Sequence, residues 1–154
     1  MARRHRQDDY AGAISFGAFL ILLAVVYLTN PNILSEAEAF VRDFKPVQIS
    51  QNFWWVEPSA NHPLLYNAAA QFCYAFGFVH VAVLALLLVK KSSARQKART
   101  FSDIIFWLGV GYMFGILSSG TLPWISFIGA FIILVGISIV VRSTILLFAF
   151  RGQS

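Results

Sequence analysis

The sequence has very little cysteine, since Cys73 is the one cysteine among 154 residues. A single cysteine cannot close a disulfide within the chain, and it cannot build the cysteine clusters that hold zinc or iron–sulfur centres. Charged residues are scarce as well, at 12% of the chain, whereas a soluble domain usually carries about 25%. The sequence also lacks internal repeats, low-complexity segments and glycine-rich nucleotide-binding motifs. These absences argue against a disulfide scaffold and against a soluble domain.

In their place the sequence has apolar runs, and 58% of its residues are hydrophobic. About 20 consecutive apolar residues suffice for a helix to cross a bilayer. Four runs of this kind predict transmembrane helices at residues 11–29, 63–89, 103–119 and 123–141. The first run could be part of a cleaved signal peptide, but it is long for that role and no small-x-small cleavage site follows it. We therefore expect one all-α membrane domain, residues 1–154, with four helices in up-down order and antiparallel neighbours.

The polar connection at residues 30–62 contains a short amphipathic pattern. Its apolar residues recur every three or four positions, which predicts a helix over residues 33–44 that ends before Pro46. Trp54 and Trp55 follow, and tryptophans of this kind favour the membrane–water interface. With Trp124 at the start of the last span, they are predicted to anchor the chain at that interface. Alternatively, the helix and the tryptophans form a docking surface for a partner or a lid over the bundle.

The second connection, residues 90–101, is strongly basic, and Ser102 is a plausible N-cap for the span that follows it. Lysine and arginine near membrane spans gather on the cytoplasmic side. Ten such residues flank one side of the predicted spans and two flank the other, Arg42 and Lys45. The sequence therefore predicts that both termini and the basic loop are cytoplasmic, and that residues 30–62 lie outside. The formal charge of +5 is explained by this topology, so no nucleic-acid partner is expected.

Two histidines bracket the second span but do not form a pair. His62 and His80 are 18 residues apart, so they point in the same direction but lie roughly 27 Å apart along a helix. Cys73 and His80 share a face at about 10 Å separation. Both distances are too long for shared metal ligation or for a nucleophile–base pair. No catalytic, cofactor-binding or metal-ligating residues are therefore predicted.

Other polar residues of the second span fall into two stripes when 100° is allowed for each residue. Asn67, Gln71 and Tyr74 form one stripe, while Cys73 and His80 form the other. The remaining arc, between Leu65 and Leu86, is apolar and is predicted to face lipid, so that both stripes face neighbouring helices. Asn67 and Gln71 are then interpreted as interhelical hydrogen-bonding groups, each worth about 0.6 to 2 kcal/mol, with a polar path as the alternative.

His80 is the one histidine placed deep in a span, and it has two interpretations. An ionisable residue at this depth can serve as a proton relay or a ligand contact. A relay would lack a carboxylate partner within the spans. The favoured interpretation is a neutral imidazole bonded to a tyrosine, a serine or a carbonyl of a facing helix. In the third span, Gly111 and Gly115 form a small-xxx-small pair that permits close packing of helices.

Three stretches together resemble a group of small archaeal four-span membrane proteins of uncharacterised function. They are "AGAISFGAFLILLAVVYLT", "NHPLLYNAAAQFCYAFG" and "FSDIIFWLGVGY", and the resemblance covers most of the chain. It implies an archaeal cytoplasmic membrane and a four-span layout, and it implies no activity, cofactor or site residue.

The pattern as a whole favours a non-enzymatic membrane protein without a cofactor. It predicts an accessory or structural subunit of a membrane complex, or a self-associating helix bundle, whose partners are the lipid bilayer and other membrane subunits or a second copy. The alternative is a small carrier or channel, possibly a homodimer, that uses the face of Asn67, Gln71 and Tyr74. A membrane enzyme comes third, because no catalytic constellation is visible.

Overall fold

A computed structural model describes residues 2–90 and 92–151, with side chains described for residues 12–90 and 92–148. These parts contain five helices and a two-stranded sheet. In chain order the elements are α1 (Ala2–Thr29), α2 (Ile33–Arg42), β1 (Phe44–Ser50), β2 (Phe53–Pro58), α3 (Pro63–Val89), α4 (Ala94–Ser118) and α5 (Trp124–Arg151). Within the described residues, four helices are long and apolar enough to span a membrane, α1, α3, α4 and α5. The prediction of a mostly helical chain with four such helices is confirmed.

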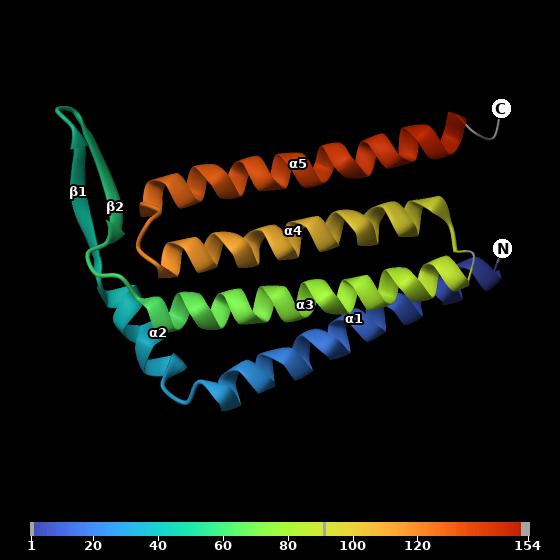
Figure 1. The fold of residues 1–154 in the computed structure, drawn as a ribbon, viewed down its shortest axis with the longest axis horizontal. Helices are drawn as coiled ribbons and strands as arrows, with labels where there is room; N and C mark the ends of the chain where they lie inside the picture. The colour runs from blue at the N-terminus through green and yellow to red at the C-terminus, as the bar shows by residue number, and fades with distance from the viewer. Residues whose placement is uncertain (1, 91, 152–154) are drawn as a thin grey trace.

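The four long helices lie side by side and alternate in direction (Figure 1). Helix α3 has α4 on one side and α1 on the other, and α5 packs against α4. The start of α1, the end of α5 and the connection from α3 to α4 lie at one end of the molecule. Helix α2 and the hairpin of β1 and β2 lie at the other end, where the hairpin runs across the helix ends (Figure 1).

The boundaries of α3 agree with the predicted span 63–89, but α4 begins earlier than predicted. Its N-cap is Ser93, whose side chain accepts a hydrogen bond from the Gln96 amide at 3.4 Å. The interpretation of residues 90–101 as a loop is therefore wrong for most of them, because lysine, arginine, glutamine and alanine are good helix formers. Ser102 is not a cap. It is buried and donates to the Ser138 carbonyl of α5 at 2.7 Å.

Residues 30–62, which we call the outer segment after the predicted topology, contain the predicted amphipathic helix, and it ends at Arg42, two residues earlier than predicted. The residues after it form an antiparallel hairpin, which the sequence prediction missed. Phe44 pairs with Pro58 and Val47 pairs with Trp55. Aromatic and β-branched side chains favour such strands. Pro46 is tolerated in β1 because both strands of a two-stranded sheet are edge strands.

An aromatic cluster joins this outer segment to the long helices. The Phe40 ring lies 5.6 Å from Trp124 and 6.0 Å from Tyr66 between centroids, and Trp124 stacks on Phe127 at 5.4 Å. Tyr66 and Phe127 are buried. Edge-to-face and offset ring pairs of this kind contribute about 0.5–1.5 kcal/mol beyond their buried area. The cluster therefore holds α2 against the ends of α3 and α5.

Candidate functional site

Asp43 holds the outer segment in place beside this cluster. The Ser59 hydroxyl donates to Asp43 Oδ1, and the Ala60 amide donates to Oδ2 at 2.6 Å. His62 Nε2 lies 3.2 Å from Oδ2, and its Nδ1 lies 3.8 Å from Glu36 Oε2. The hydrogen bonds from Ser59 and Ala60 lower the pKa of the Asp43 carboxyl to about 2, since they favour the charged form. His62 occupies the N-cap position of α3, as expected for a residue at the outer helix start.

The two predicted polar stripes of α3 have different environments. Cys73 and His80 are buried, whereas Asn67 and Gln71 are exposed and Tyr74 keeps 37% of its surface exposed. Asn67 and Gln71 therefore do not face a neighbouring helix of the described chain, and their interhelical bonds stay a prediction that concerns a partner chain. Among the described residues neither amide has a hydrogen-bond partner. Only the stripe of Cys73 and His80 faces inward.

The arc predicted to face lipid is instead partly covered by α1 and α4. Ala68 and Val83 of this arc are buried. The Phe72 ring lies 5.3 Å from Phe19 of α1 and 6.0 Å from Trp107 of α4. The large apolar side chains gain contacts by packing against these helices. The polar stripe is consequently left on the outside of α3.

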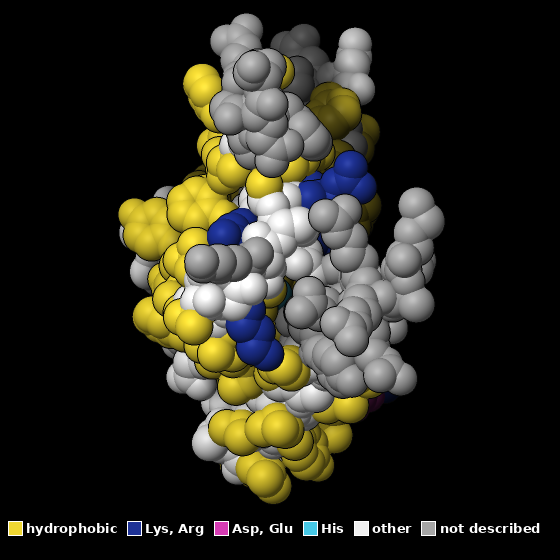
Figure 2. Space-filling view, turned by 90° about the vertical axis from the view of Figure 1, so that its right-hand side faces the viewer, with side chains coloured by type: hydrophobic (Ala, Val, Ile, Leu, Met, Phe, Trp, Pro, Cys, Tyr) yellow, Lys and Arg dark blue, Asp and Glu magenta, His cyan; other side chains and the backbone are white. Residues whose placement is uncertain are grey.

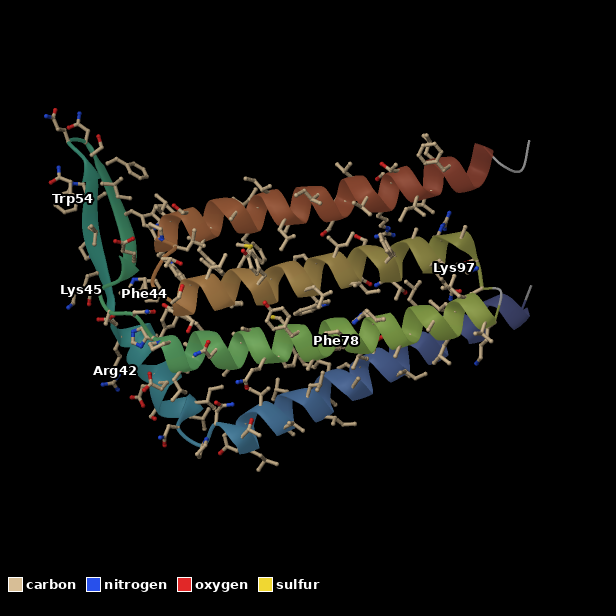
Figure 3. All side chains as sticks on the ribbon, viewed as in Figure 1. Arg42, Phe44, Lys45, Trp54, Phe78 and Lys97 are labelled. Atoms are coloured by element: carbon tan, nitrogen blue, oxygen red, sulfur yellow. The ribbon has the colours of Figure 1, made fainter. Side chains whose placement is uncertain are left out.

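This outward stripe of α3 continues along the whole helix with alternating steps of four and three residues. We call it the α3 seam, and all its members are exposed: Asn67, Gln71, Tyr74, Phe78, Val81, Ala85 and Leu88. Phe78, at its centre, is 65% exposed and is labelled in Figure 3. A heptad spacing of this kind is the one that lets two helices interlock along their length.

His80 lies on the wall of a cavity near the basic end of the molecule. The ring is buried, and Nδ1 lies 2.9 Å from the Phe76 carbonyl of its own helix. The expected bond to a facing helix is therefore wrong. Because a carbonyl can only accept, Nδ1 is the nitrogen that donates a proton to it. The cavity has a volume of about 710 Å³ and lies between α1, α3 and α4, with Arg142 of α5 at its edge.

Asp103 lines the same cavity, and the sequence prediction missed its importance. Its carboxylate lies within electrostatic range of His80, Arg99 and Arg142. Asp103 is a carboxylate at the start of the predicted third span, but no hydrogen bond or ion pair joins it to His80 within the described residues. One signal was present in the sequence, because Arg99 and Asp103 are four residues apart and such pairs face each other on a helix. The cavity thus combines an imidazole, a carboxylate and arginines.

The two predicted packing glycines of α4 also differ. A methyl group at Gly111 would lie 3.0 Å from the Tyr74 ring, whereas one at Gly115 would meet nothing within 4 Å. Gly111 therefore allows α3 and α4 to approach, and Gly115 does not serve a contact within the described chain. Two further glycines pack closely, since a methyl at Gly77 would meet Leu108 at 2.7 Å and one at Gly109 would meet Leu134 at 2.6 Å.

The three predicted anchor tryptophans have three environments. Trp124 is half-buried in the aromatic cluster. Trp55 is half-buried in β2, and its Nε1 atom is buried without a hydrogen-bond partner among the described residues. Trp54 is 61% exposed and projects from the hairpin (Figure 3). Of the three, Trp54 has the exposure that an interfacial anchor requires.

Comparisons with family models, with curated proteins and with solved structures give no match. Within the described residues, no group of three or more histidine, cysteine, aspartate or glutamate side chains could hold a metal ion. The α3 seam and the cavity beside His80, the inner cavity, are therefore the two candidate sites.

Proposed function

We propose that this chain is a non-enzymatic integral membrane protein that associates with a second copy of itself through the α3 seam. The observation that carries the proposal is the exposure of Gln71, an unpartnered amide on the outside of an apolar helix. Its neighbours along the seam, Tyr74 and Phe78, are exposed as well. Association in this form makes the protein a structural component of the membrane.

The depth of Gln71 in a bilayer makes a partner necessary. Helix α3 has 27 residues and is therefore about 40 Å long, whereas the hydrocarbon core is about 30 Å thick. With the hydrocarbon core starting at the outer ends of the helices, Gln71 lies about 12 Å inside it. An amide there has no water to bond, which costs several kcal/mol if it is left unpaired. A second helix that supplies a donor and an acceptor removes this cost.

A second copy is a suitable partner because the seam is self-complementary. A glutamine amide donates and accepts, and a two-fold axis along the membrane normal brings the same residue of two chains to the same depth. Asn67 would then meet Asn67, and Gln71 would meet Gln71. The apolar residues below them would interlock at heptad spacing.

The charges support one orientation for this assembly. Lysine and arginine side chains gather at the end that holds the connection from α3 to α4 (Figure 2). Arg42 and Lys45 lie at the opposite end, with Lys97 at the basic end (Figure 3). Because positive residues favour the cytoplasmic side, we propose a multi-pass protein of the cytoplasmic membrane with both termini inside. The hairpin and α2 then lie at the outer surface, where Trp54 can enter the interface.

Replacement of Gln71 by leucine tests the association. Leucine keeps the apolar size of the side chain and removes the paired amides, so we expect a detergent-solubilised dimer to become more than half monomer, as measured by native mass spectrometry. The matched control is Gln48→Leu, which removes an exposed amide of the hairpin and should leave the mass unchanged.

Two results would contradict the proposal of a second copy. A monomer in the wild-type protein would leave the seam without its partner. A complex with a different membrane protein at fixed ratio would show that the seam binds another chain, and would support the accessory-subunit alternative.

The second candidate function is a small carrier or channel. Asn67, Gln71 and Tyr74 lie on the outside of the chain, so a polar path lined by them would have to form between two copies. Flux of a small polar solute through liposomes that contain the wild-type dimer, and its loss in Gln71→Leu after chemical cross-linking, would favour this function.

A further inference from the structure

The inner cavity is large enough to hold part of a bound molecule. Its volume is about 710 Å³, within the range of about 300–1,000 Å³ that is usual for ligand sites. It has a polar and an apolar half. Arg99, Asp103 and Arg142 line the polar half, whereas Phe19, Val83 and Leu87 are among the apolar residues.

The polar half is positively charged. The described lining residues include three arginines, Arg95, Arg99 and Arg142, against one carboxylate, Asp103. All three arginines are exposed, and none of them has an ion pair within 4.0 Å among the described residues. Guanidinium groups bind phosphate oxygens in a bidentate manner. Asp103 lines the same half as Arg99 and Arg142 and offsets part of their positive charge.

Arg99 and Arg142 belong to different helices but lie at about the same distance from the outer ends of those helices. Arg99 is 19 residues before the end of α4 at Ser118, and Arg142 is 18 residues after the start of α5 at Trp124. A rise of 1.5 Å per residue puts them about 29 Å and 27 Å from the outer ends of these helices. A hydrocarbon core of about 30 Å then ends at their level. This is where the phosphate groups of the inner leaflet begin.

The apolar half continues from this level towards the outer ends of the helices. Val83 of α3 lies near the level of the arginines, and Phe76 lies two turns before it on α3, with its ring 5.8 Å from the Phe19 ring of α1. A free phosphate ion would use only the polar half of this lining. A molecule with an anionic phosphate and a hydrocarbon chain would use both halves.

We infer that the inner cavity binds an anionic phospholipid of the cytoplasmic leaflet, with its phosphate against Arg99 and Arg142 and an acyl chain along Phe76 and Phe19. Basic pockets between membrane helices on the cytoplasmic side suit such headgroups. The inference rests on the membrane orientation proposed above, and it does not depend on association through the α3 seam.

The test uses the full chain, delipidated in detergent and titrated with phosphatidylglycerol or phosphatidylcholine, with bound lipid counted by native mass spectrometry. We expect the wild type to bind phosphatidylglycerol about tenfold more tightly than phosphatidylcholine, and the double variant Arg99→Gln/Arg142→Gln to lose this preference. Lys90→Gln is the matched control. It removes a positive charge at the same end of the molecule outside the cavity lining and should leave the preference unchanged.

A second variant tests the apolar half with all charges intact. Val83→Phe fills part of the cavity, so phosphatidylglycerol binding should weaken about tenfold, while the helical circular dichroism spectrum stays unchanged.

Excess inorganic phosphate should not displace the lipid. Displacement by phosphate would show a free-anion site in place of a lipid site. Equal binding of the two lipids, or equal losses in Lys90→Gln and the arginine variant, would overturn the inference. The membrane placement itself is read separately, from recovery of each variant in the membrane fraction.

Discussion

At the residue scale, Asp43 holds the outer segment to the helices. Its carboxylate accepts from the Ser59 hydroxyl and the Ala60 amide, and His62 lies against it. These contacts lower its pKa from 3.8 to about 2. Because the folded pKa is below the unfolded value, the charged form stabilises the attachment above about pH 4. This stabilisation is lost as the pH falls toward about 2.

The first prediction concerns the removal of this charge. Asp43→Asn keeps the shape but replaces one acceptor oxygen with a donor, so the near-ultraviolet circular dichroism of the aromatic cluster should weaken already at neutral pH. In the wild type the same loss should occur only between about pH 4 and pH 2. The control is Glu38→Gln, which removes an exposed carboxylate of α2 that pairs with Arg42. An identical acid transition in the wild type and in Asp43→Asn would show that Asp43 does not control the attachment.

At the same scale, the orientation of Asn67 could not be obtained from the sequence. The spacing of Asn67 and Cys73 separates two stripes correctly, but it does not say which stripe faces the neighbours. That choice depends on the aromatic packing of Phe72 with Phe19 and Trp107, which joins residues far apart in the chain. Helical periodicity describes one helix at a time.

At the element scale, the contact between α3 and α4 depends on which glycine faces the partner helix. Gly111 and Gly115 are one turn apart, but only Gly111 lies under the ring of Tyr74. A small-xxx-small pattern predicts that two helices approach each other closely. It does not identify which of the two small residues lies in the contact.

The second prediction compares alanine at these two glycines. Gly115→Ala should be neutral or stabilising by up to about 1 kcal/mol, because alanine is the better helix former. Gly111→Ala gains the same propensity but forces the Tyr74 ring aside, so its unfolding free energy should be lower than that of Gly115→Ala by about 1–3 kcal/mol. Unfolding in mixed micelles with a denaturing detergent measures the difference. Equal stability of the two variants would contradict the assignment of the α3–α4 contact to Gly111.

The elements themselves were predictable to different degrees. The apolar run of α3 has Pro63 at its start and lysines at its end, and its predicted bounds are confirmed. The start of α4 was misjudged because its charged first turns resemble a loop in composition, although their residues favour helix and Ser93 caps them. The hairpin was missed because the aromatic residues of β2 were interpreted only as interfacial anchors. Its strands pair across only two residues, Gln51 and Asn52, without the glycine that usually signals such a turn.

At the scale of the whole molecule, three regions have different properties: the two ends of the long helices and the outward side of α3. One end carries the hairpin (Figure 1) and the aromatic cluster, and the opposite end carries basic residues (Figure 2) and the arginines that line the cavity. The outward side of α3 carries the exposed amides. The proposed dimer uses this side and leaves the cavity open to lipid, so association and lipid binding can be disrupted independently.

The most direct test of the proposed dimer is cysteine cross-linking along the α3 seam, in a Cys73→Ala background. Phe78→Cys is compared with Ile139→Cys, since these residues are 65% and 61% exposed on α3 and α5 and both lie 15 residues from the outer ends of their helices. We predict that oxidation in native membranes links two chains through position 78 and leaves position 139 unlinked. Equal cross-linking at both positions, or none at position 78, would contradict association through α3.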